Sequence, residues 1–335
     1  MHSSPFSRRR AIQTLFCSSA ALALNVRPDR LAAEVAKEAL HLLMIGDFGT
    51  GSANQVKVSQ AMKKFMAGSG IKPAGLLLLG DNFYSKDKEG FSTQSKRWTT
   101  EIEEMYPAAV FPGPMWAVLG NHDYHDNLGG EKVQLAYAQK EGVRWKMPAK
   151  WYRFDLGPKD QPVVTFLCLD SNLPAVSGGK DKKTGQPKPH MSAEEEKAQL
   201  AWLKAELEKP RAPFTIAVGH HPLYSNGSHG DTKELIAQWE PLFQKHHVHA
   251  YLCGHDHDLQ HLEMAERFTT HLLSGGGGAS TRKLPGERKM PFGKDIHGFT
   301  HLQITTEALT FTHYSAEGAA LHTVTKKLDG SFAFG

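Results

Sequence analysis

One local pattern occurs five times in the chain and constrains its fold more than any other feature. In each copy a short apolar run ends at a glycine, and the next residues carry carboxylate, amide, phenol or imidazole groups. Short apolar runs bounded by turn residues are typical of buried strands. The five runs are residues 42–46, 76–80, 116–120, 215–219 and 250–254. Because an unpaired buried charge is costly, Asp47 and Asp81, which follow the first two runs directly, need partners.

Helical patterns alternate with these strands and predict an α/β chain. The predicted helices are residues 52–67, a stretch around 98–105, 131–141, 192–209 and 232–245. Further strands are predicted at 151–156, 163–169 and 268–274. Such alternation predicts mostly parallel strands with helices on both faces. The tail, residues 298–327, alternates apolar and polar side chains and predicts antiparallel strands. We expect one domain over residues 40–335.

Residues 1–39 are predicted to be an export signal and a leader. Three arginines at 8–10 precede an apolar stretch at 11–24, and residues 21–23 form an Ala-x-Ala cleavage site. Paired arginines favour the twin-arginine route, although Ala11 and Ile12 depart from its usual pattern, and an ordinary secretory signal is the alternative. We therefore expect a periplasmic or secreted protein. No later run reaches the roughly 20 apolar residues of a membrane span, so no stable membrane insertion is expected after signal removal.

Charge and cysteine content exclude two further classes of protein. Residues 1–23 hold three of the 39 basic residues and no acid; the remaining 36 basic residues face 35 acidic residues, so the charge does not indicate a nucleic-acid partner. Three cysteines are too few for a disulfide framework. Cys168 and Cys253 lie in predicted strands and are expected to be buried thiols, with a bridge between them as the alternative. We expect a monomer.

The residues after the predicted strands form a candidate metal site. In open α/β sheets, ligands bind beyond the carboxyl ends of the strands. The side chains expected at that edge are Asp47, Asp81, Tyr84, Asn121, His220, His255 and His257. Their oxygen and imidazole donors suit iron, manganese or zinc. Seven ligands exceed the needs of one tetrahedral zinc and suit two metals about 3.5–4 Å apart, with Asp81 as the bridging candidate.

The charge of such a centre predicts its substrate. Two carboxylates and a phenolate carry about −3, and a trivalent with a divalent metal carries about +5, so one hydroxide leaves about +1 and open positions. This charge attracts a phosphate monoester dianion. A metal lowers the pKa of bound water to about 7. The sequence therefore predicts a binuclear acid phosphatase, active at acidic to neutral pH, that uses in-line attack of a metal-bound hydroxide.

Five motifs in this order resemble those of a known family. They are GDFG at 46–49, GDNFY at 80–84, GNHD at 120–123, VGHH at 218–221 and GHDH at 254–257. The set is similar to the calcineurin-like metallophosphoesterases, and the Tyr84 variant is similar to the purple acid phosphatases, above all the small tartrate-resistant type. The similarity extends over residues 41–335. It implies an α/β sandwich of two mixed β-sheets flanked by helices, with the active site at the C-terminal ends of the strands.

The resemblance also implies the role of each ligand. The ferric ligands would be Asp47, Tyr84 and His257. The ligands of the divalent metal, which would be Fe²⁺, Zn²⁺ or Mn²⁺, would be Asn121, His220 and His255. Asp81 would bridge the two ions.

Two further histidines acquire a role from the resemblance. His122 would contact the phosphate and protonate the leaving group, and His229 would be a second histidine facing the substrate. Other histidines, such as His125 and His221, are expected at the surface or around the ligands. Asp123 is expected either to orient His122 or to cap the local backbone. The polar loop 177–190 falls where mammalian relatives carry an exposed, cleavable loop of different sequence.

Two alternatives to a monoesterase share these residues. The same site would suit a phosphodiesterase or a nucleotide pyrophosphatase, since those substrates differ only in what is attached to the phosphorus. A non-hydrolytic iron protein that binds phosphate or cycles redox is the second alternative. The glycine run 275–278 lacks the Lys-Ser/Thr of a phosphate loop and is expected to be a tight turn near the site. A small phosphorylated molecule is the expected substrate in the leading hypothesis.

Overall fold

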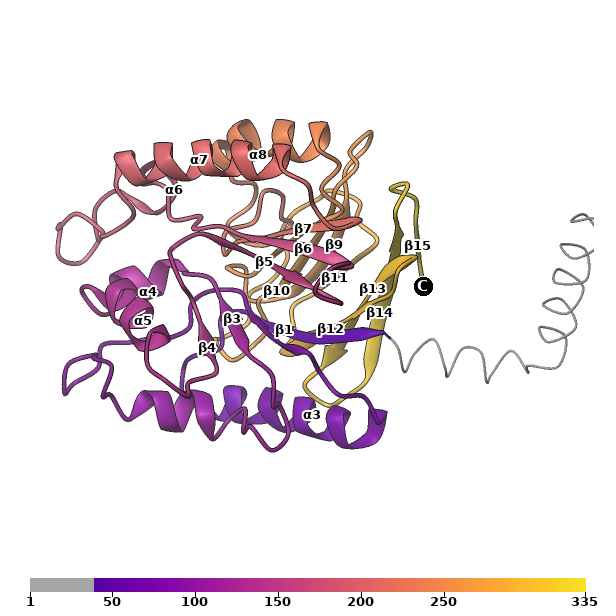
Figure 1. Cartoon of the computed structure of the whole chain (residues 1–335). Coiled ribbons are helices and arrows are strands. Elements are labelled where there is room, and N and C mark those ends of the chain that lie inside the picture. Colours follow the sequence, from indigo (N-terminus) through magenta and orange to yellow (C-terminus); the bar gives the residue numbers. More distant parts are fainter. Residues whose placement is uncertain (1–38) are drawn as a thin grey trace, which may run out of the picture. The chain divides into compact units, whose positions relative to one another are not determined.

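Two mixed β-sheets lie at the centre of the part of the chain that the computed structural model describes, residues 39–335 (Figure 1). The first sheet has the order β15-β14-β13-β12-β1-β2-β3-β4 and the second β11-β9-β10-β8-β7-β6-β5. Residues Leu40–Gly335 form one unit. The predicted export signal lies outside the described residues.

The strand bounds follow the predicted runs closely. The first sheet contains β1 (Leu40–Ile45), β2 (Gly75–Leu78), β3 (Met115–Ala117), β4 (Trp145–Lys146), β12 (Gly298–Ile304), β13 (Ala308–Ser315), β14 (Ala320–Lys327) and β15 (Phe332–Phe334). The second contains β5 (Tyr152–Leu156), β6 (Val164–Cys168), β7 (Phe214–Val218), β8 (Ala250–Cys253), β9 (Leu259–Glu263), β10 (Thr270–Ser274) and β11 (Phe292–Lys294).

Helices cover the outer faces of the two sheets (Figure 1). They are α3 (Ala53–Ser69), the π-helix η1 (Trp98–Glu103), α4 (Asn121–His125), α5 (Gly130–Ala138), α6 (Pro174–Ser177), α7 (Ala193–Glu208) and α8 (Lys233–Lys245). Helix α7 begins with a capping box, in which the Ser192 side chain accepts from the Glu195 N–H and the Glu195 carboxylate accepts from the Ser192 N–H. Gly70 ends α3 in the left-handed conformation.

The expectation of mostly parallel strands is only half right. Strands joined through helices are parallel, as in the β1-β2-β3-β4 and β6-β7-β8 series, and β8 also pairs in parallel with β10, although β9 and no helix lies between them in the chain. Each sheet is then extended by antiparallel strands, β12 to β15 in the first and β5, β9 and β11 in the second. The short connections after β9 and β12 allow antiparallel pairing with β10 and β13, which needs no crossover helix. The expected sandwich of two mixed sheets is confirmed.

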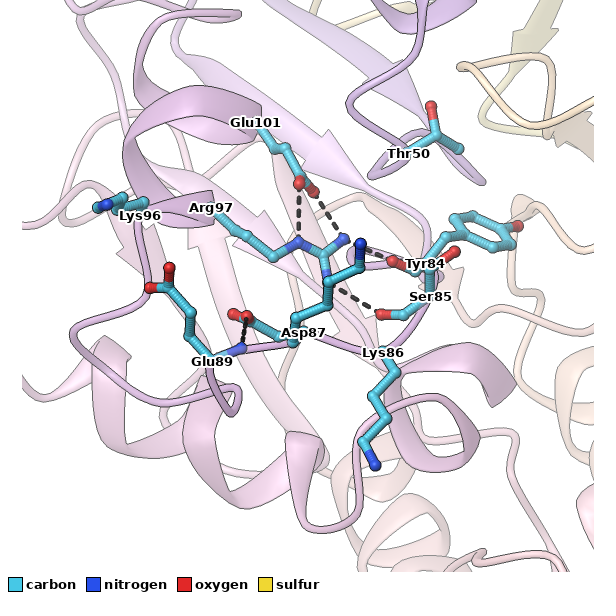
Figure 2. A pocket seen from close by; sticks show the side chains of 10 residues that line it. Thr50, Tyr84, Ser85, Lys86, Asp87, Glu89, Lys96, Arg97 and Glu101 are labelled. Atoms are coloured by element: carbon cyan, nitrogen blue, oxygen red, sulfur yellow. Dashed lines mark hydrogen bonds and ion pairs between the residues drawn. The ribbon is translucent and has the colours of Figure 1, made fainter.

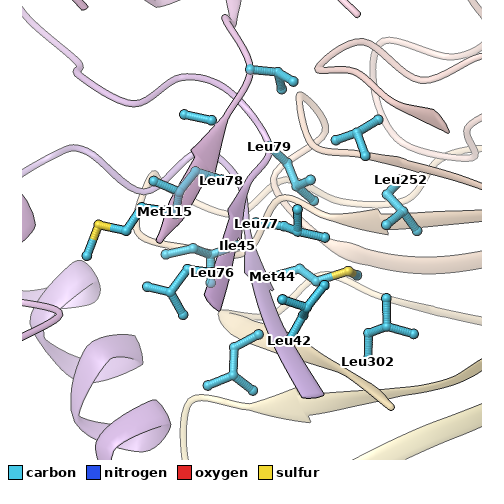
Figure 3. Packing of buried hydrophobic residues seen from close by; sticks show 14 of the residues in the cluster. Leu42, Met44, Ile45, Leu76, Leu77, Leu78, Leu79, Met115, Leu252 and Leu302 are labelled. Carbon is cyan, nitrogen blue, oxygen red and sulfur yellow. The ribbon is translucent and has the colours of Figure 1, made fainter. Parts of the chain in front are cut away.

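Two apolar clusters hold these layers together. The larger one fills the space between the sheets and under α3, and Figure 3 shows Met44 and Leu77 within it, together with Leu252 of the second sheet and Leu302. The smaller one joins the second sheet to α7 and α8 through residues such as Trp239. The inner strands are buried on both faces, which explains why their sequences are continuously apolar.

Two smaller expectations also meet the structure. Cys168 and Cys253 are free and buried, so the alternative of a bridge between them is excluded. Within residues 39–335, no helix combines the length and apolar character needed to cross a bilayer.

Candidate metal centre

The turns after the strands place three predicted ligands in a strained backbone conformation. Asp47, Asp81 and His255 have φ values of 58°, 52° and 69°. Residues other than glycine rarely adopt such values, and those that do concentrate at functional sites. At two of these turns, the residue after the glycine has the positive φ and the glycine, Gly46 or Gly254, does not; at the third turn, Gly80 itself has a φ of 88°.

The glycines at the strand ends leave room for a ligand that follows another strand. A Cβ atom on Gly254 would lie 2.3 Å from Asp47 Oδ2, and one on Gly120 would lie 2.1 Å from Asp81 Oδ1. Real Cβ atoms essentially never approach heavy atoms below 3.0 Å. The recurrent glycine of the sequence pattern is therefore a requirement of close packing between strand ends.

A first cluster of donor atoms surrounds the Tyr84 hydroxyl. It lies 3.1 Å from Asp47 Oδ1, 2.9 Å from Asp81 Oδ2 and 3.2 Å from His257 Nε2. His257 Nδ1 lies 2.7 Å from the carbonyl oxygen of Ser280, which fixes the ring and leaves Nε2 facing the cluster. Ligands of one cation with bond lengths of about 2.1 Å lie about 3 Å apart at right angles, so this spacing fits a single metal.

A second cluster surrounds His220 Nε2. This atom lies 3.3 Å from Asn121 Oδ1, 3.2 Å from His255 Nδ1 and 3.4 Å from Asp81 Oδ2. The other ring nitrogen of His220 lies 2.9 Å from the carbonyl oxygen of Leu79. The structure thus brings all seven predicted ligands together in two adjoining groups, each with members from both sheets.

Asp81 belongs to both clusters through the same oxygen atom. Oδ2 faces Tyr84 and His220, while Oδ1 accepts from the His122 N–H at 2.8 Å. Burial alone would raise the pKa of Asp81, but the charge and hydrogen bonding of His220 and His122 outweigh burial and lower it. The same pairing raises the pKa of His220 to about 9 against the effect of its burial.

The donor set fits a pair of cations. Asp47 and Asp81 are 0 % and 1 % exposed, and within residues 39–335 neither carboxylate has a Lys or Arg partner. Burial, followed by the charges of Asp47 and Asp81, raises the pKa of the Tyr84 phenol well above its usual value. A metal ion supplies the positive charge that this arrangement requires and reverses the effect on the phenol.

Two histidines beside the clusters are each held by a carboxylate. His122 Nδ1 lies 3.0 Å from Asp126 Oδ2, and its side chain is 32 % exposed. His229 Nδ1 lies 2.7 Å from Asp256 Oδ1, and its side chain is 41 % exposed. The His229 ring packs on His255 with 4.2 Å between the ring centroids. In both, the bonded Nδ1 leaves Nε2 as the ring nitrogen available to a ligand.

Other residues near the clusters have supporting roles. His221 is buried, with its ring nitrogens 2.8 Å from Ser171 Oγ and 3.3 Å from Ser177 Oγ, and its ring centroid lies 4.3 Å from that of His255, so of the two expected positions it has the one around the ligands. Of the two roles expected for Asp123, the structure shows the backbone cap. Its carboxylate accepts from the N–H groups of Gly120, Asn82 and Phe83.

The glycine run lies beside the centre, as expected. Gly277 donates to the carbonyl oxygen of Gly46, and Ala279 donates to that of Asp47. Both bonds join the second sheet to the turn that carries the first ligand.

An arginine clamps the loop that carries Tyr84 (Figure 2). The Arg97 guanidinium donates to the carbonyl oxygens of Tyr84, Ser85 and Gly49 and forms an ion pair with Glu101. Arg97 lines a cavity of about 370 Å³. Among the residues that line this cavity, Tyr84 is the only one predicted to be a metal ligand. In Figure 2 the Tyr84 ring points away from Arg97, so this cavity lies behind the loop and not over the clusters.

Sequence reasoning missed the carboxylate partners of the two histidines and Arg97. Asp126 follows His122 by four residues, which is the spacing of neighbours on one helix face, and that signal was available. Asp256 stands between two predicted ligands. Arg97 lies outside every motif, and no sequence signal singles it out.

The strand-end clusters and the two-sheet sandwich define a class of metal-dependent phosphoesterase folds, and comparison with known proteins gives the family. Residues 40–259 match the profile described as "Calcineurin-like phosphoesterase". The chain therefore belongs to the calcineurin-like phosphoesterases, a hydrolytic family.

Named relatives narrow the similarity further. The chain is 30 % identical over 303 residues to tartrate-resistant acid phosphatase type 5 of Oryctolagus cuniculus, covering 86 % of this chain and 91 % of that protein. It is 30 % identical over 297 residues to purple acid phosphatase 7 of Arabidopsis thaliana, covering 84 % of each. A solved structure of GAP50, the anchor in the inner membrane complex of Plasmodium, superposes with a TM-score of 0.72 at 20 % identity and covers 86 % of this chain and 88 % of that chain. At that identity the structural likeness concerns the fold alone.

Proposed function

We propose that the protein is a binuclear metal-dependent acid phosphatase that hydrolyses phosphate monoesters. The observation that carries this proposal is the position of Asp81 Oδ2, which lies 2.9 Å from the hydroxyl group in one cluster and 3.4 Å from the imidazole nitrogen in the other. One carboxylate oxygen shared by two donor groups fits a pair of metal ions about 3.5–4 Å apart. The names of its relatives agree with this activity.

The chemistry of the two clusters supports different ions. Asp47, Tyr84 and His257 include the phenol, a hard anionic donor once deprotonated, and would hold Fe³⁺. Asn121, His220 and His255 offer neutral donors and would hold a divalent ion, Fe²⁺, Zn²⁺ or Mn²⁺. When bound, the metal pair would supply an activated water and positive charge beside the phosphoryl group.

The protein's own residues would then position the ester and complete the proton transfer. Asp126 orients His122, and Asp256 orients His229, so that each presents Nε2 toward the open side of the clusters. His122, with His229 as the second candidate, protonates the leaving alkoxide. General acid catalysis of this kind raises the rate of a reaction by about 10²–10⁴-fold. Gly120 and Gly254 keep the strand ends close enough to hold this geometry.

A visible spectrum combined with turnover tests the proposal. The purified protein, loaded with iron, is expected to show a phenolate-to-iron absorption band and to hydrolyse simple phosphate monoesters. Absence of both the band and the activity after metal loading, with two metals bound per chain, would contradict it.

The leaving group separates this proposal from its alternatives. Relative rates on a monoester, a diester and a pyrophosphate, measured with the same preparation, distinguish a monoesterase from a phosphodiesterase or nucleotide pyrophosphatase. A non-hydrolytic iron protein would show none of these activities, and His122→Ala would leave its phosphate binding or redox cycle intact.

We also propose that the chain is exported and acts as a monomer on small phosphorylated substrates, without a nucleic-acid partner. The sequence at residues 8–10 and 21–23 supports export, by the twin-arginine route in the simplest case. Replacing Arg8 and Arg9 by Lys should block export by that route and leave an ordinary secretory route working. Light scattering of the purified protein measures its oligomeric state.

A further inference from the structure

A cavity of about 480 Å³ adjoins the open side of the centre. One wall is α4, with Asn121, His122 and His125, and the other is the hairpin after α6, closed by the bridge between Lys180 and Pro187. The residues that line the cavity thus include a predicted metal ligand, Asn121, and the proposed general acid, His122. The alcohol that leaves the phosphorus atom next to His122 would lie in this cavity.

Both carboxylates that line the cavity are already engaged. Asp126 accepts from the Ser85 N–H and contacts His122. Asp181 Oδ1 accepts from the Lys183 N–H at 3.0 Å, the Thr184 N–H at 2.8 Å and the Thr184 hydroxyl at 2.9 Å. Asp126 Oδ2 and Asp181 Oδ1 thus stabilise the histidine and the loop.

Two nitrogen groups of the same cavity have no such partner. Lys188 is half-buried, and within residues 39–335 its ammonium group makes no hydrogen bond and no ion pair, although its main-chain N–H bonds to Gly179. His125 Nε2 is buried and has no hydrogen-bond partner in the described part of the chain. Burial, followed by the charge of Lys188, lowers the pKa of His125, so the lysine acts on this ring. An unpaired polar atom in a buried place is costly unless a ligand satisfies it.

We propose that this cavity holds the leaving group of the substrate and selects alcohols that carry a second anionic group, a carboxylate or a phosphate. The anion pairs with the Lys188 ammonium and contacts His125, while the phosphoryl group that is hydrolysed lies at the two metal clusters. This inference rests on the proposed phosphatase activity and adds a substrate class to it.

A matched pair of esters tests the selection. Glycerol 2-phosphate and 2-phosphoglycerate are both secondary alkyl phosphates, and the second has a carboxylate where the first has a hydroxymethyl group. Lys188→Met should lower the ratio of kcat/KM for 2-phosphoglycerate over glycerol 2-phosphate about tenfold, mainly through KM, because a single charge-assisted contact is lost. Lys188→Arg should keep most of the ratio.

Lys182 provides the matched control. It is an exposed lysine of the same hairpin and does not line the cavity, so Lys182→Met should leave the ratio as in the wild type. An equal fall in both lysine variants would indicate general attraction by the hairpin and overturn the proposal, as would an unchanged ratio in Lys188→Met.

The two levels of inference fail in different ways. If the wild-type protein with both metals bound hydrolyses neither ester, the proposed phosphatase activity is wrong. If it hydrolyses glycerol 2-phosphate and the ratio does not respond to Lys188→Met, only the selection by the cavity is wrong.

Discussion

Histidines in two regions of this protein have opposite electrostatic surroundings. At the centre, His220, His122 and His229 each lie within 3.4 Å of a carboxylate oxygen, and the pKa values of the first two are raised. Burial, followed by the charges of neighbouring histidines, lowers the pKa values of His255 and His221 at the same centre. Away from the centre, a second group lies in or directly before the inner strands; among its members in the described part of the chain, only His271 has a carboxylate within 4 Å of a ring nitrogen, Glu240 Oε2 at 3.9 Å from Nε2. There burial dominates and lowers the pKa of His271 and His313 to about 3, and that of His249, His301 and His322 to about 4.

The difference teaches what raises the pKa of a histidine against the effect of burial, namely a carboxylate beside the ring. In this chain of nineteen histidines, residue type alone does not distinguish the groups. Every histidine of the first group lies in or beside a strand-end turn that also brings in an aspartate. The second group lies within strands, as His271 in β10, His301 in β12 and His313 in β13 do, or directly before one, as His249 does before β8.

The largest effect is expected from Asp81→Asn, which removes the carboxylate that both clusters share. We expect metal content to fall and kcat/KM to drop by more than about 10³-fold, because the charge that holds both ions is lost. Metal analysis of the purified variant and a phosphatase assay measure this. Asp87→Asn, on the same loop, is the control and should behave as the wild type; two tightly bound metals in Asp81→Asn would contradict the shared-oxygen arrangement.

The next largest effect is expected from His122→Ala. Loss of the general acid should lower kcat about 10²-fold for alkyl phosphates and less for aryl phosphates, whose leaving groups need less protonation. Metal content should not change. A uniform loss for both classes of ester would show that His122 positions the phosphate and does not transfer the proton, and His229→Ala in the same assay reveals whether the second histidine takes that role.

Removing the orienting carboxylates should have a smaller effect. Asp126→Asn and Asp256→Asn leave the His122 and His229 rings in place but weaken the hydrogen bond to Nδ1. We expect kcat to fall about tenfold in the variant whose histidine is the general acid. The comparison of the two variants is the measurement. Equal, negligible effects would mean that neither histidine depends on its aspartate.

The smallest effect per residue concerns stability in acid and tests the second group of histidines. Since their folded-state pKa values lie below the unfolded value of about 6.5, the unfolded chain binds more protons between that pH and about 3–4. Their contribution to stability is therefore complete above pH 6.5 and is lost as the pH falls. His313→Gln should reduce the pH dependence of the unfolding free energy by about 1.4 kcal/mol per pH unit in this window. Urea unfolding at pH 5 to 7 measures it.

An exposed histidine provides the control for that slope. His247→Asn changes a side chain at the surface whose φ of 51° asparagine tolerates, and it should leave the pH dependence unaltered. A slope for His313→Gln that equals the wild-type slope would show that His313 is protonated in the folded protein.

The sequence predicted the strand ends well because each is a local pattern. The run from Leu76 to Asp81 needs no distant partner to be identified as a buried strand followed by a carboxylate. The antiparallel strand β9 was missed, since it begins directly after the GHDH motif without a turn signal of its own. Its position in the sheet depends on pairing with β10 on one side and β11 on the other, which is not local information.

The candidate site was predictable as a list of residues but not as an arrangement. Nothing local assigns Tyr84 and His255 to different clusters, because that division depends on how the two sheets face each other. The serine contacts of His221 and the wall around Lys188 likewise arise from segments that meet only in the folded chain.

The close approach of Gly254 to the Asp47 carboxylate has a consequence for the order of assembly. Asp47 ends a strand of the first sheet and Gly254 ends one of the second, more than 200 positions apart along the chain. Neither donor cluster exists until the sheets have docked, because each takes side chains from both. Metal binding during refolding would therefore begin when the two sheets dock. Formation of either sheet alone would produce no metal binding.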